Sequence, residues 1–568
     1  MKDWSPAPAV RWLFASEPGA RNGLLPRWIF LRALGLIYYS AFFSLVFQIK
    51  GLIGPQGILP AGEYLRAVTG QFGRIGYWYA PTLLWLSSGR HMLTAICWAG
   101  MIASVLLVLN LWPRGMLAIC FVCFLSFVSG AQDFSGYQSD GMLLEAGFIS
   151  LFFAPGGFRP RLGEASPPSR ASWFLLLWEC FRIYFESGVA KIIGGDPQWR
   201  NFEALDEYYQ NGPLPTWIGW YLQHWPHWFH AATSFGTLAL ELALVWMMFL
   251  PRRFRMVCFC IVTPWQIGII LSANYTFLNY LVLALGFLLL DDKLLERFVP
   301  ERWKKSEGHA ATDGKASQAK EKTAGLNLRL QETLQDSEFL GAEEVKPEAE
   351  ASSQRHWQGA LHKQWAALTL AMTAVMLSWM FYATAVQLIW MVKPAELPTT
   401  PVSALEPFRI ANRYGLFAIM TRGRYEIEFQ GSDDGQKWLV YPFRFKPQDP
   451  AKAPGIYAPY QPRFDWNLWF ASLSTWREEP IVPRTEQALL RGSEDVLQLF
   501  AGNPFPKAPP RQVRAVLSQY WFTGPAEKRA TGTWWRREQL GLYAPALERE
   551  ADGRIVVLQW PQIVEPRE

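Results

Sequence analysis

The stretch SWFLLLWECFRIYFESGVAKII, residues 172–193, decides the fold class of this chain. It is apolar and long enough to cross a bilayer as one helix, which needs about 20 residues. Glu179, Arg182 and Glu186 nevertheless lie within it, and Lys191 follows near its end. A helix places the first three side chains on one face. Since each charge at this depth costs about 3 kcal/mol, we expect all four to serve packing or chemistry.

The composition separates a membrane part from a more soluble part. Half of the 568 residues are hydrophobic, 15% are aromatic and 29 are Trp, which is far from the composition of an ordinary soluble enzyme. The net charge of +6 is spread over loops that flank apolar segments. A nucleic-acid-binding protein needs a clustered basic face instead, so this class is excluded. All six cysteines precede residue 261, so the tail is not a disulfide scaffold.

Nine apolar runs are predicted to be membrane-spanning helices. They are 29–49, 92–111, 116–130, 141–155, 172–193, 231–250, 255–272, 275–290 and 364–392. The loops on one side carry Arg27, Arg114 and Arg252, whereas loops 131–140 and 273–274 on the other side carry no Lys or Arg. Because basic residues stay on the cytoplasmic side, we expect a cytoplasmic N-terminus and a tail on the opposite side.

The expected fold class is an α-helical multi-pass membrane bundle plus a C-terminal β-rich (α+β) soluble domain. The predicted parts are a cytoplasmic N-terminal segment (1–28), a bundle of about eight spans (29–290), a charged and largely disordered cytoplasmic connector (291–363), a final transmembrane helix (364–392) and an extracytoplasmic β-rich domain (393–568). One short helix is expected in the connector, near 326–334.

Strand patterns begin in the tail. Residues 425–429 and 438–445 alternate between apolar and polar side chains, and Asp434-Gly435 between them predicts a hairpin turn. Helices are expected to follow at 466–473, 486–499 and 534–540.

Polar residues before the fourth apolar run extend the charged set. Gln138 and Glu145 are two helical turns apart, and Asp140 is placed to cap the helix. Glu145 could pair with Arg182 or Lys191 across the bundle. The predicted intramembrane polar network is Gln138, Asp140, Glu145, Glu179, Arg182, Glu186 and Lys191.

Two interpretations of these charges stay open. Arg182 lies between two glutamates, which is typical of a self-neutralising helix face buried in a bundle. Lys191 has no acid at helical spacing, so it is either an interfacial anchor or a desolvated amine that acts as a base. The catalytic candidates are Lys191, Glu145, Glu186 and Asp196.

The loop at 194–230 is rich in aromatic and polar side chains. The candidates in it are Asp196, Trp199, Arg200, Asp206 and Tyr209. His224, His227 and His230 could in principle ligate a metal, but Pro226 interrupts their helix and no carboxylate or Cys completes the set. We therefore expect no metal, and since no phosphate-binding loop or nucleophile signature occurs, no cofactor.

The tail is dense in Trp and Arg, the residue types that dominate interface hot spots. They form either the core of the domain or a client-binding surface. The candidates for that surface are Arg463, Asp465, Trp466, Trp469, Trp521, Trp535 and Arg536.

Motifs in order along both halves point to a family. They are YQSD (137–140), LEAG (144–147), SGVAK (187–191), GDPQWR (195–200), NRYGLF (412–417), EFQGSDDG (428–435), PRFDW (462–466) and YWF (520–522). By these motifs the chain resembles the lipase maturation factors along nearly its whole length apart from the connector. The resemblance implies a multi-pass membrane protein, in animals of the endoplasmic reticulum, that helps homodimeric secreted lipases fold and assemble through a lumenal C-terminal domain.

The chain departs from that family in its long charged connector, its cysteine-free tail and its lack of a usable glycosylation sequon. These departures indicate a bacterial relative in the inner membrane, or in the endoplasmic reticulum membrane if the source is eukaryotic. The expected partners are the lipid bilayer and an exported client protein, which need not be a lipase.

The membrane half alone also resembles vitamin K-dependent γ-carboxylase and its bacterial relatives, in which a lysine after the corresponding small-residue stretch acts as base. Lys191 is the matching position. The alternative function is thus a membrane enzyme that uses Lys191 on a lipid-soluble substrate or cofactor, and a structural scaffold is a third. A buried cavity that opens beside Lys191 would favour the enzyme, and a solid bundle with an exposed apolar patch on the tail would favour the maturation factor.

Overall fold

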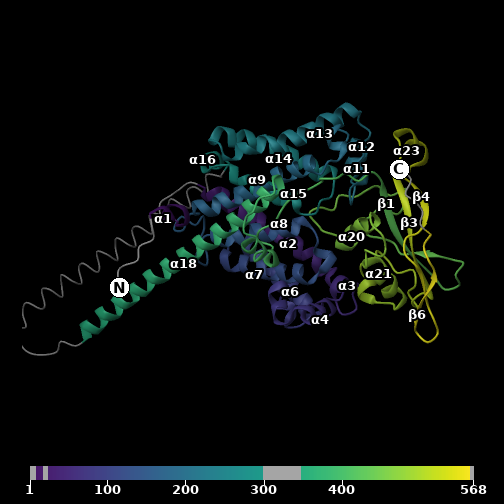
Figure 1. Cartoon of the computed structure of the whole chain (residues 1–568), viewed down its shortest axis with the longest axis horizontal. Coiled ribbons are helices and arrows are strands. Elements are labelled where there is room, and N and C mark those ends of the chain that lie inside the picture. The colour runs from purple at the N-terminus through teal and green to yellow at the C-terminus, as the bar shows by residue number, and fades with distance from the viewer. Residues whose placement is uncertain (1–7, 17–22, 299–346, 563–568) are drawn as a thin grey trace, which may run out of the picture.

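A computed structural model describes residues 8–16, 23–298 and 347–562, with side chains from residue 364 onward in the last range. Helices make up the first part and a six-stranded antiparallel sheet dominates the end (Figure 1). The predicted fold class, a multi-pass helical bundle with a C-terminal β-rich domain, is confirmed. The core of the predicted connector, with the short helix expected in it, lies outside the described residues.

Each predicted apolar run overlaps a helix of nine residues or more. These are α2 (Leu24–Val46), α6 (Arg90–Val108), α7 (Pro113–Gly130), α8 (Gln138–Phe153), α9 (Arg170–Ile193), α13 (His227–Leu242), α14 (Arg252–Ser272), α15 (Leu278–Gly286) and α18 (Pro347–Val392). Among the described residues, six helical stretches are long and apolar enough to cross a membrane. The remaining three are α8 and α15, which are short, and α9, which carries the charges. The protein is therefore an integral membrane protein, and the number of crossings stays a prediction.

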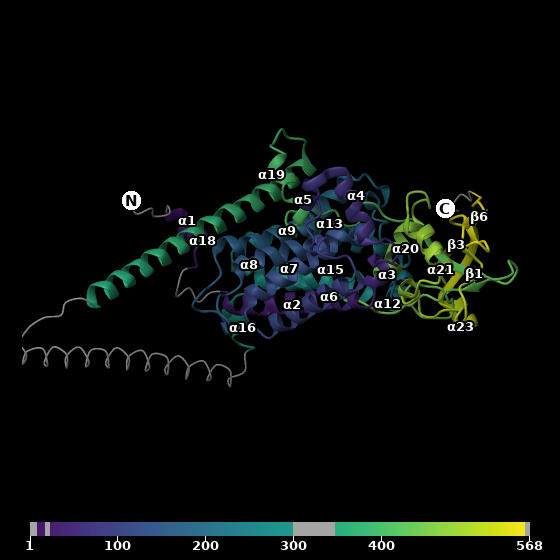
Figure 2. The same cartoon turned by 90° about the horizontal axis from the view of Figure 1, so that it is seen from below.

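Short helices connect these long ones. They are α1 (Pro8–Phe14), α3 (Ile49–Ile53), α4 (Ala61–Phe72), α5 (Gly76–Tyr79), α10 (Pro197–Arg200), α11 (Tyr208–Asn211), α12 (Trp217–Gln223), α16 (Asp292–Leu295) and α19 (Thr400–Ser403). The last long helix, α18, begins before the predicted start at 364 and so extends into the predicted connector. Its first half projects beyond the bundle at the end where α1 and α16 lie (Figures 1 and 2).

The sheet lies at the other end of the bundle. Its strands are β1 (Arg424–Ser432), β2 (Leu439–Val440), β3 (Gln512–Phe522), β4 (Trp535–Leu542), β5 (Ala546–Arg549) and β6 (Ile555–Gln559). Their order is β2-β1-β3-β5-β6, with β4 also paired to β3. The predicted hairpin is confirmed as β1 and β2, and Gly435 adopts φ 72° in its turn, where glycine carries no steric penalty.

The helices predicted in the tail match those of the structure only in part. α20 (Arg463–Ser472) is confirmed, but the helix predicted at 486–499 is broken into α21 (Ile481–Leu490) and α22 (Glu494–Leu497) around Gly492, which adopts φ 68°. The helix predicted at 534–540 is wrong, because these residues form strand β4. Pairing with β3 outweighs the helix propensity of the Arg and Glu side chains there.

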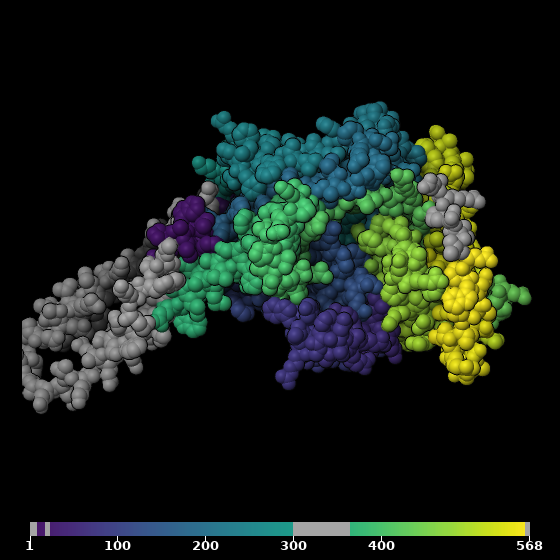
Figure 3. Space-filling model, viewed as in Figure 1, coloured from purple at the N-terminus to yellow at the C-terminus, as the bar shows by residue number. Residues whose placement is uncertain are grey.

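α20 and α21 lie between the sheet and the bundle (Figures 1 and 2). One continuous apolar core includes Phe30 of α2, Phe277 before α15, Phe464 of α20 and Val513 of β3. The C-terminal domain therefore packs directly on the bundle, as the space-filling view shows (Figure 3). Both halves of the chain share this core, so side chains from each can build a common site.

Candidate functional site

Arg182 of α9 is the centre of the charge network inside the bundle. It is fully buried and donates to Glu145 of α8 and, over 2.7 Å, to the carbonyl of Asn412. Glu186 is 3.7 Å away, beyond hydrogen-bond distance. The prediction that Glu145 pairs across the bundle is confirmed for Arg182. The self-neutralising face is formed only in part, since neither carboxylate oxygen of Glu179 has a hydrogen-bond partner among the described residues.

The network holds a piece of the C-terminal chain, residues 410–421, called here the return segment. Glu145 accepts from the backbone N–H of Asn412 at 3.1 Å and from the hydroxyl of Tyr414 at 2.8 Å. Glu186 accepts from the N–H of Tyr414 at 2.7 Å, and Gln138 accepts from that of Gly415 at 3.0 Å. The predicted polar network thus binds backbone from the other half of the protein.

Lys191 and the loop candidates continue this pattern along the return segment. Lys191 donates to the carbonyl of Leu416 at 2.9 Å, and Trp199 donates to that of Phe417 at 2.9 Å. Asp196 accepts from the N–H of Met420 at 2.7 Å. The return segment is neither helix nor strand, so its buried polar backbone needs such side-chain partners.

Arg463 and Asp140 form a second connection between the halves. Two guanidinium nitrogens of Arg463 donate to the two Asp140 oxygens at 2.7 and 2.8 Å, and one of them also donates to the carbonyl of Phe134. Such bidentate pairs are among the strongest polar contacts in proteins. Two expectations are corrected here. Asp140 does not cap α8, whose N-cap residue Tyr137 makes no side-chain cap, and Arg463 is fully buried rather than on a client surface.

Lys191 has an acidic partner that the sequence analysis missed. Its ammonium donates to both oxygens of Glu241 on α13, at 2.8 and 2.9 Å. Helical spacing along α9 does not indicate this partner, because Glu241 lies on another helix. The available signal was a single carboxylate inside the otherwise apolar run 231–250.

The remaining loop candidates divide between interior and surface. Tyr209 packs in an aromatic cluster with Trp220 of α12 and with Trp535 of β4. Asp206 lies 3.0 Å from the ring nitrogen of His227, and Arg200 is exposed. The three loop histidines bind separate partners, and no group of three metal-ligating side chains is found in the described ranges.

Most of the predicted client-binding residues lie in the interior. Those at most 9% exposed are Arg463, Asp465, Trp466, Trp469 and Trp535. Asp465 accepts from the backbone N–H groups of Phe445 and Lys446, and burial raises its pKa to about 6. Arg536 is exposed and Trp521 half-buried. For the five interior residues the prediction of an exposed surface is corrected, because they pack inside the molecule. For Arg536 and Trp521 client binding stays a prediction.

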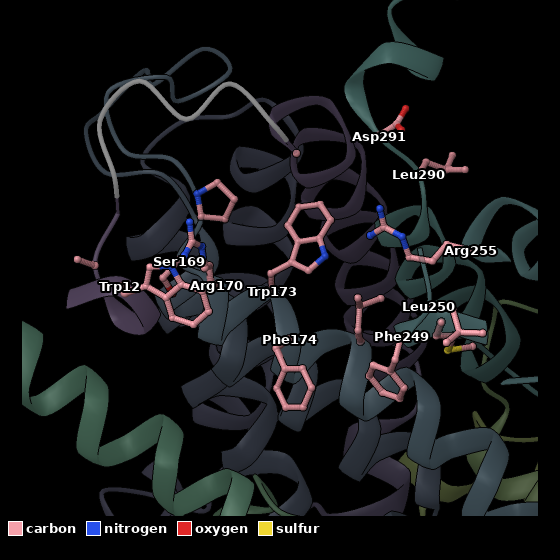
Figure 4. Close-up of a pocket in the computed structure, with 15 residues that line it drawn as sticks. Trp12, Ser169, Arg170, Trp173, Phe174, Phe249, Leu250, Arg255, Leu290 and Asp291 are labelled. Carbon is pink, nitrogen blue, oxygen red and sulfur yellow. The ribbon is translucent and has the colours of Figure 1, made fainter. Parts of the chain in front are cut away.

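Two of the cavities between the described helices bear on the alternatives and on the charged residues. One, of about 510 Å³, lies at the end near α1, where Arg170 lies over the ring of Trp12 and Arg255 points toward Trp173 (Figure 4). The other, of about 550 Å³, is lined by Lys191 together with Glu241 and side chains of α9, α13, α14 and α15. The bundle is therefore not solid beside Lys191, which was the observation expected to favour the enzyme alternative.

An apolar patch is also exposed on the tail. Leu558 of β6 and Trp560 just after it share one face of the strand and are 49% and 60% exposed, and Val557 on the opposite face is 40% exposed. β6 is the last strand of the sheet, and its outer edge pairs with no strand in the described part of the chain. The exposed apolar residues expected for a maturation factor are thus present, but the solid bundle expected with them is not.

Comparison with known proteins assigns the family. Residues 25–297 match the model of the lipase maturation factor transmembrane domain, and residues 410–545 match that of the lipase maturation factor C-terminal domain. Lipase maturation factor 2 of Gallus gallus is 32% identical over 585 residues, covering 92% of this chain and 81% of that protein. Lipase maturation factor 1 of Bos taurus is 31% identical over 554 residues, covering 94% of this chain and 91% of that protein. No solved structure matches the chain. With both domains matched in order and most of each relative covered, the chain belongs to the lipase maturation factor family.

Proposed function

We propose that this protein is a membrane-anchored maturation factor that assists the folding and assembly of exported proteins, lipases among them. The lipase clients follow from the names of the relatives. The main observation behind the mechanism is the exposed edge strand β6. The domain that carries β6 is attached to the bundle by the buried ion pair of Arg463 and Asp140. A partly folded client emerging at the membrane would meet an apolar surface at a fixed place.

The chemistry of β6 suits an extended client segment. An edge strand presents unpaired backbone N–H and C=O groups, to which another chain can add as a new strand. Exposed side chains on both faces of the strand, Leu558 and Trp560 on one and Val557 on the other, would hold apolar residues of the client that are not yet buried. Natural proteins usually protect such edges, so an exposed apolar one indicates a binding role.

We place the C-terminal domain outside the cytoplasm, in a bacterial inner membrane or in an endoplasmic reticulum membrane. The domain lies at the end of the bundle opposite to α1 and α16 (Figures 1 and 2). Arg27 and Arg252, which the charge pattern assigns to the cytoplasmic side, lie in the first turns of α2 and α14. This arrangement supports a cytoplasmic N-terminus by the positive-inside rule.

The enzyme alternative receives less support. The ammonium of Lys191 donates to both Glu241 oxygens and to the carbonyl of Leu416. A lysine that acts as base must present a free amine instead. Lys191 therefore serves the proposed function as a support of the return segment.

The test compares two edge strands of one sheet. In a host that lacks its own copy, the full chain carrying Val557→Asp is compared with the chain carrying Val440→Asp, since these valines are 40% and 37% exposed on β6 and β2. We expect the β6 variant to lower the yield of active exported lipase severalfold at equal abundance of the factor, with the β2 variant unchanged. Equal yields of active lipase with both variants would show that β6 is not the client-binding strand. Unchanged yields when the whole factor is deleted would refute the function itself.

A further inference from the structure

We infer that the cavity beside Lys191 and Glu241 binds a neutral single-chain lipid with a hydroxyl head group, of the monoacylglycerol class, drawn from the bilayer. This goes beyond the proposed function, because it concerns a ligand of the bundle and not the handling of clients. The inference rests on the shape of the cavity, its opening and the chemistry of its polar end.

The cavity has the size and walls of a lipid site. Its volume of about 550 Å³ lies within the range of small-molecule sites, roughly 300–1,000 Å³. Apolar side chains such as Ile183, Ile261, Leu278 and Val282 dominate its lining. Apolar walls gain dispersion contacts from a group that fills the space between them, and within a bilayer an acyl chain is the nearest such group.

The cavity opens toward the bilayer along α14. Cys260, Pro264 and Gly268 of this helix line the cavity and are also exposed. Thr233 and Thr237 of α13 line the facing wall and are half-buried. α13 and α14 are both long and apolar enough to span the membrane. A lipid can therefore enter sideways between these helices without passing through water.

The polar end of the cavity selects the head group. Lys191 is 2% exposed at its side chain, whereas Glu241 is 13% exposed. The accessible part of this ion pair is thus the carboxylate, which accepts hydrogen bonds and repels anions. A hydroxyl group can donate to it, but the carboxylate of a fatty acid cannot. We therefore assign a neutral, hydroxylated head group.

The experiment uses the full chain in phosphatidylcholine nanodiscs. A monoacylglycerol that carries a photoreactive diazirine in its acyl chain is cross-linked, and the labelled peptides are identified by mass spectrometry. Labelling is expected on α9, α13 and α14, and excess unlabelled monoacylglycerol should remove it, whereas a fatty acid of the same chain length should not. This competition needs no variant, so it remains decisive if a variant misfolds.

A pair of glycines supplies the steric test. A Cβ added at Gly268, in the cavity wall, or at Gly70, on α4 outside the cavities described above, meets nothing within 4 Å. Gly268→Phe should lower the labelling about tenfold by occupying the entrance, a change worth about 1.4 kcal/mol, and Gly70→Phe should leave it unchanged. Labelling spread evenly over all lipid-facing helices, equal competition by the fatty acid, or no loss in Gly268→Phe would each overturn the inference.

Discussion

Arg463 of α20 and Asp140 of α8 form a bidentate ion pair at 2.7 and 2.8 Å, with both side chains almost completely buried. One residue belongs to the C-terminal domain and the other to the membrane bundle. This pair, with the return segment, makes the two family domains one folded unit. The stability of the C-terminal domain on the bundle should therefore depend on polar contacts inside the bundle.

Arg463→Met should destabilise the protein by about 3–5 kcal/mol, because it leaves the carboxylate of Asp140 buried without its partner. Adding Asp140→Asn should restore part of the loss, since the uncompensated charge is gone. Denaturant unfolding of the full chain in detergent, with protease release of the C-terminal domain as a second readout, measures both effects. A double variant as unstable as the single one would contradict this account.

Tyr414→Phe should lower the free energy of unfolding by about 1–3 kcal/mol, because Glu145 loses a donor at 2.8 Å in a buried site. Thermal unfolding and protease release of the domain check this expectation. Tyr77→Phe is the control, since Tyr77 is 56% exposed and should tolerate the change. If both variants behave like the parent protein, Tyr414 does not hold the return segment.

Lys191 and Glu241 should be coupled. Lys191→Met leaves a buried carboxylate and Glu241→Gln leaves a buried ammonium, so each single variant should be less stable than the parent protein. The double variant should lose less unfolding free energy than the two single variants lose together, with a coupling free energy of about 1–3 kcal/mol. A double-mutant cycle by thermal unfolding measures it. Additive losses would show that the 2.8 Å contact contributes no net stability.

Asp465 should impose a pH dependence on the stability of the C-terminal domain. Burial raises its pKa from 3.8 to about 6 in the folded state. Between these values the folded protein binds more protons than the unfolded chain, so stability falls as pH rises through this range, by about 3 kcal/mol in all. Asp465→Asn should therefore flatten the profile of unfolding free energy between about pH 4 and pH 6. An unchanged slope in this variant would place the titration elsewhere.

The sequence predicted whether most segments form helices or strands, but it did not predict all of the segments that pair with one another. The hairpin β1–β2 and helix α20 follow from local patterns, and both are present. Residues 534–540 could not be assigned correctly, because their strand state depends on pairing with β3. Trp535 shows the same limit for function. Tryptophan is common at protein interfaces, and Trp535 does lie at an interface, which is the contact with Tyr209 and Trp220 inside the molecule.

By itself, the sequence determined the helical runs, the position of the charges within them and the family motifs, because hydropathy and helical periodicity act over a few residues. Only the tertiary structure decided which groups these charges meet. Lys191 meets Glu241 across 50 positions of the chain, and Asp140 meets Arg463 across 323. A buried charge must find a partner, but which one it finds depends on how helices pack and not on local pattern. The charged residues of α9 therefore predicted an interior polar network. Only the tertiary structure shows that this network binds the C-terminal part of the chain.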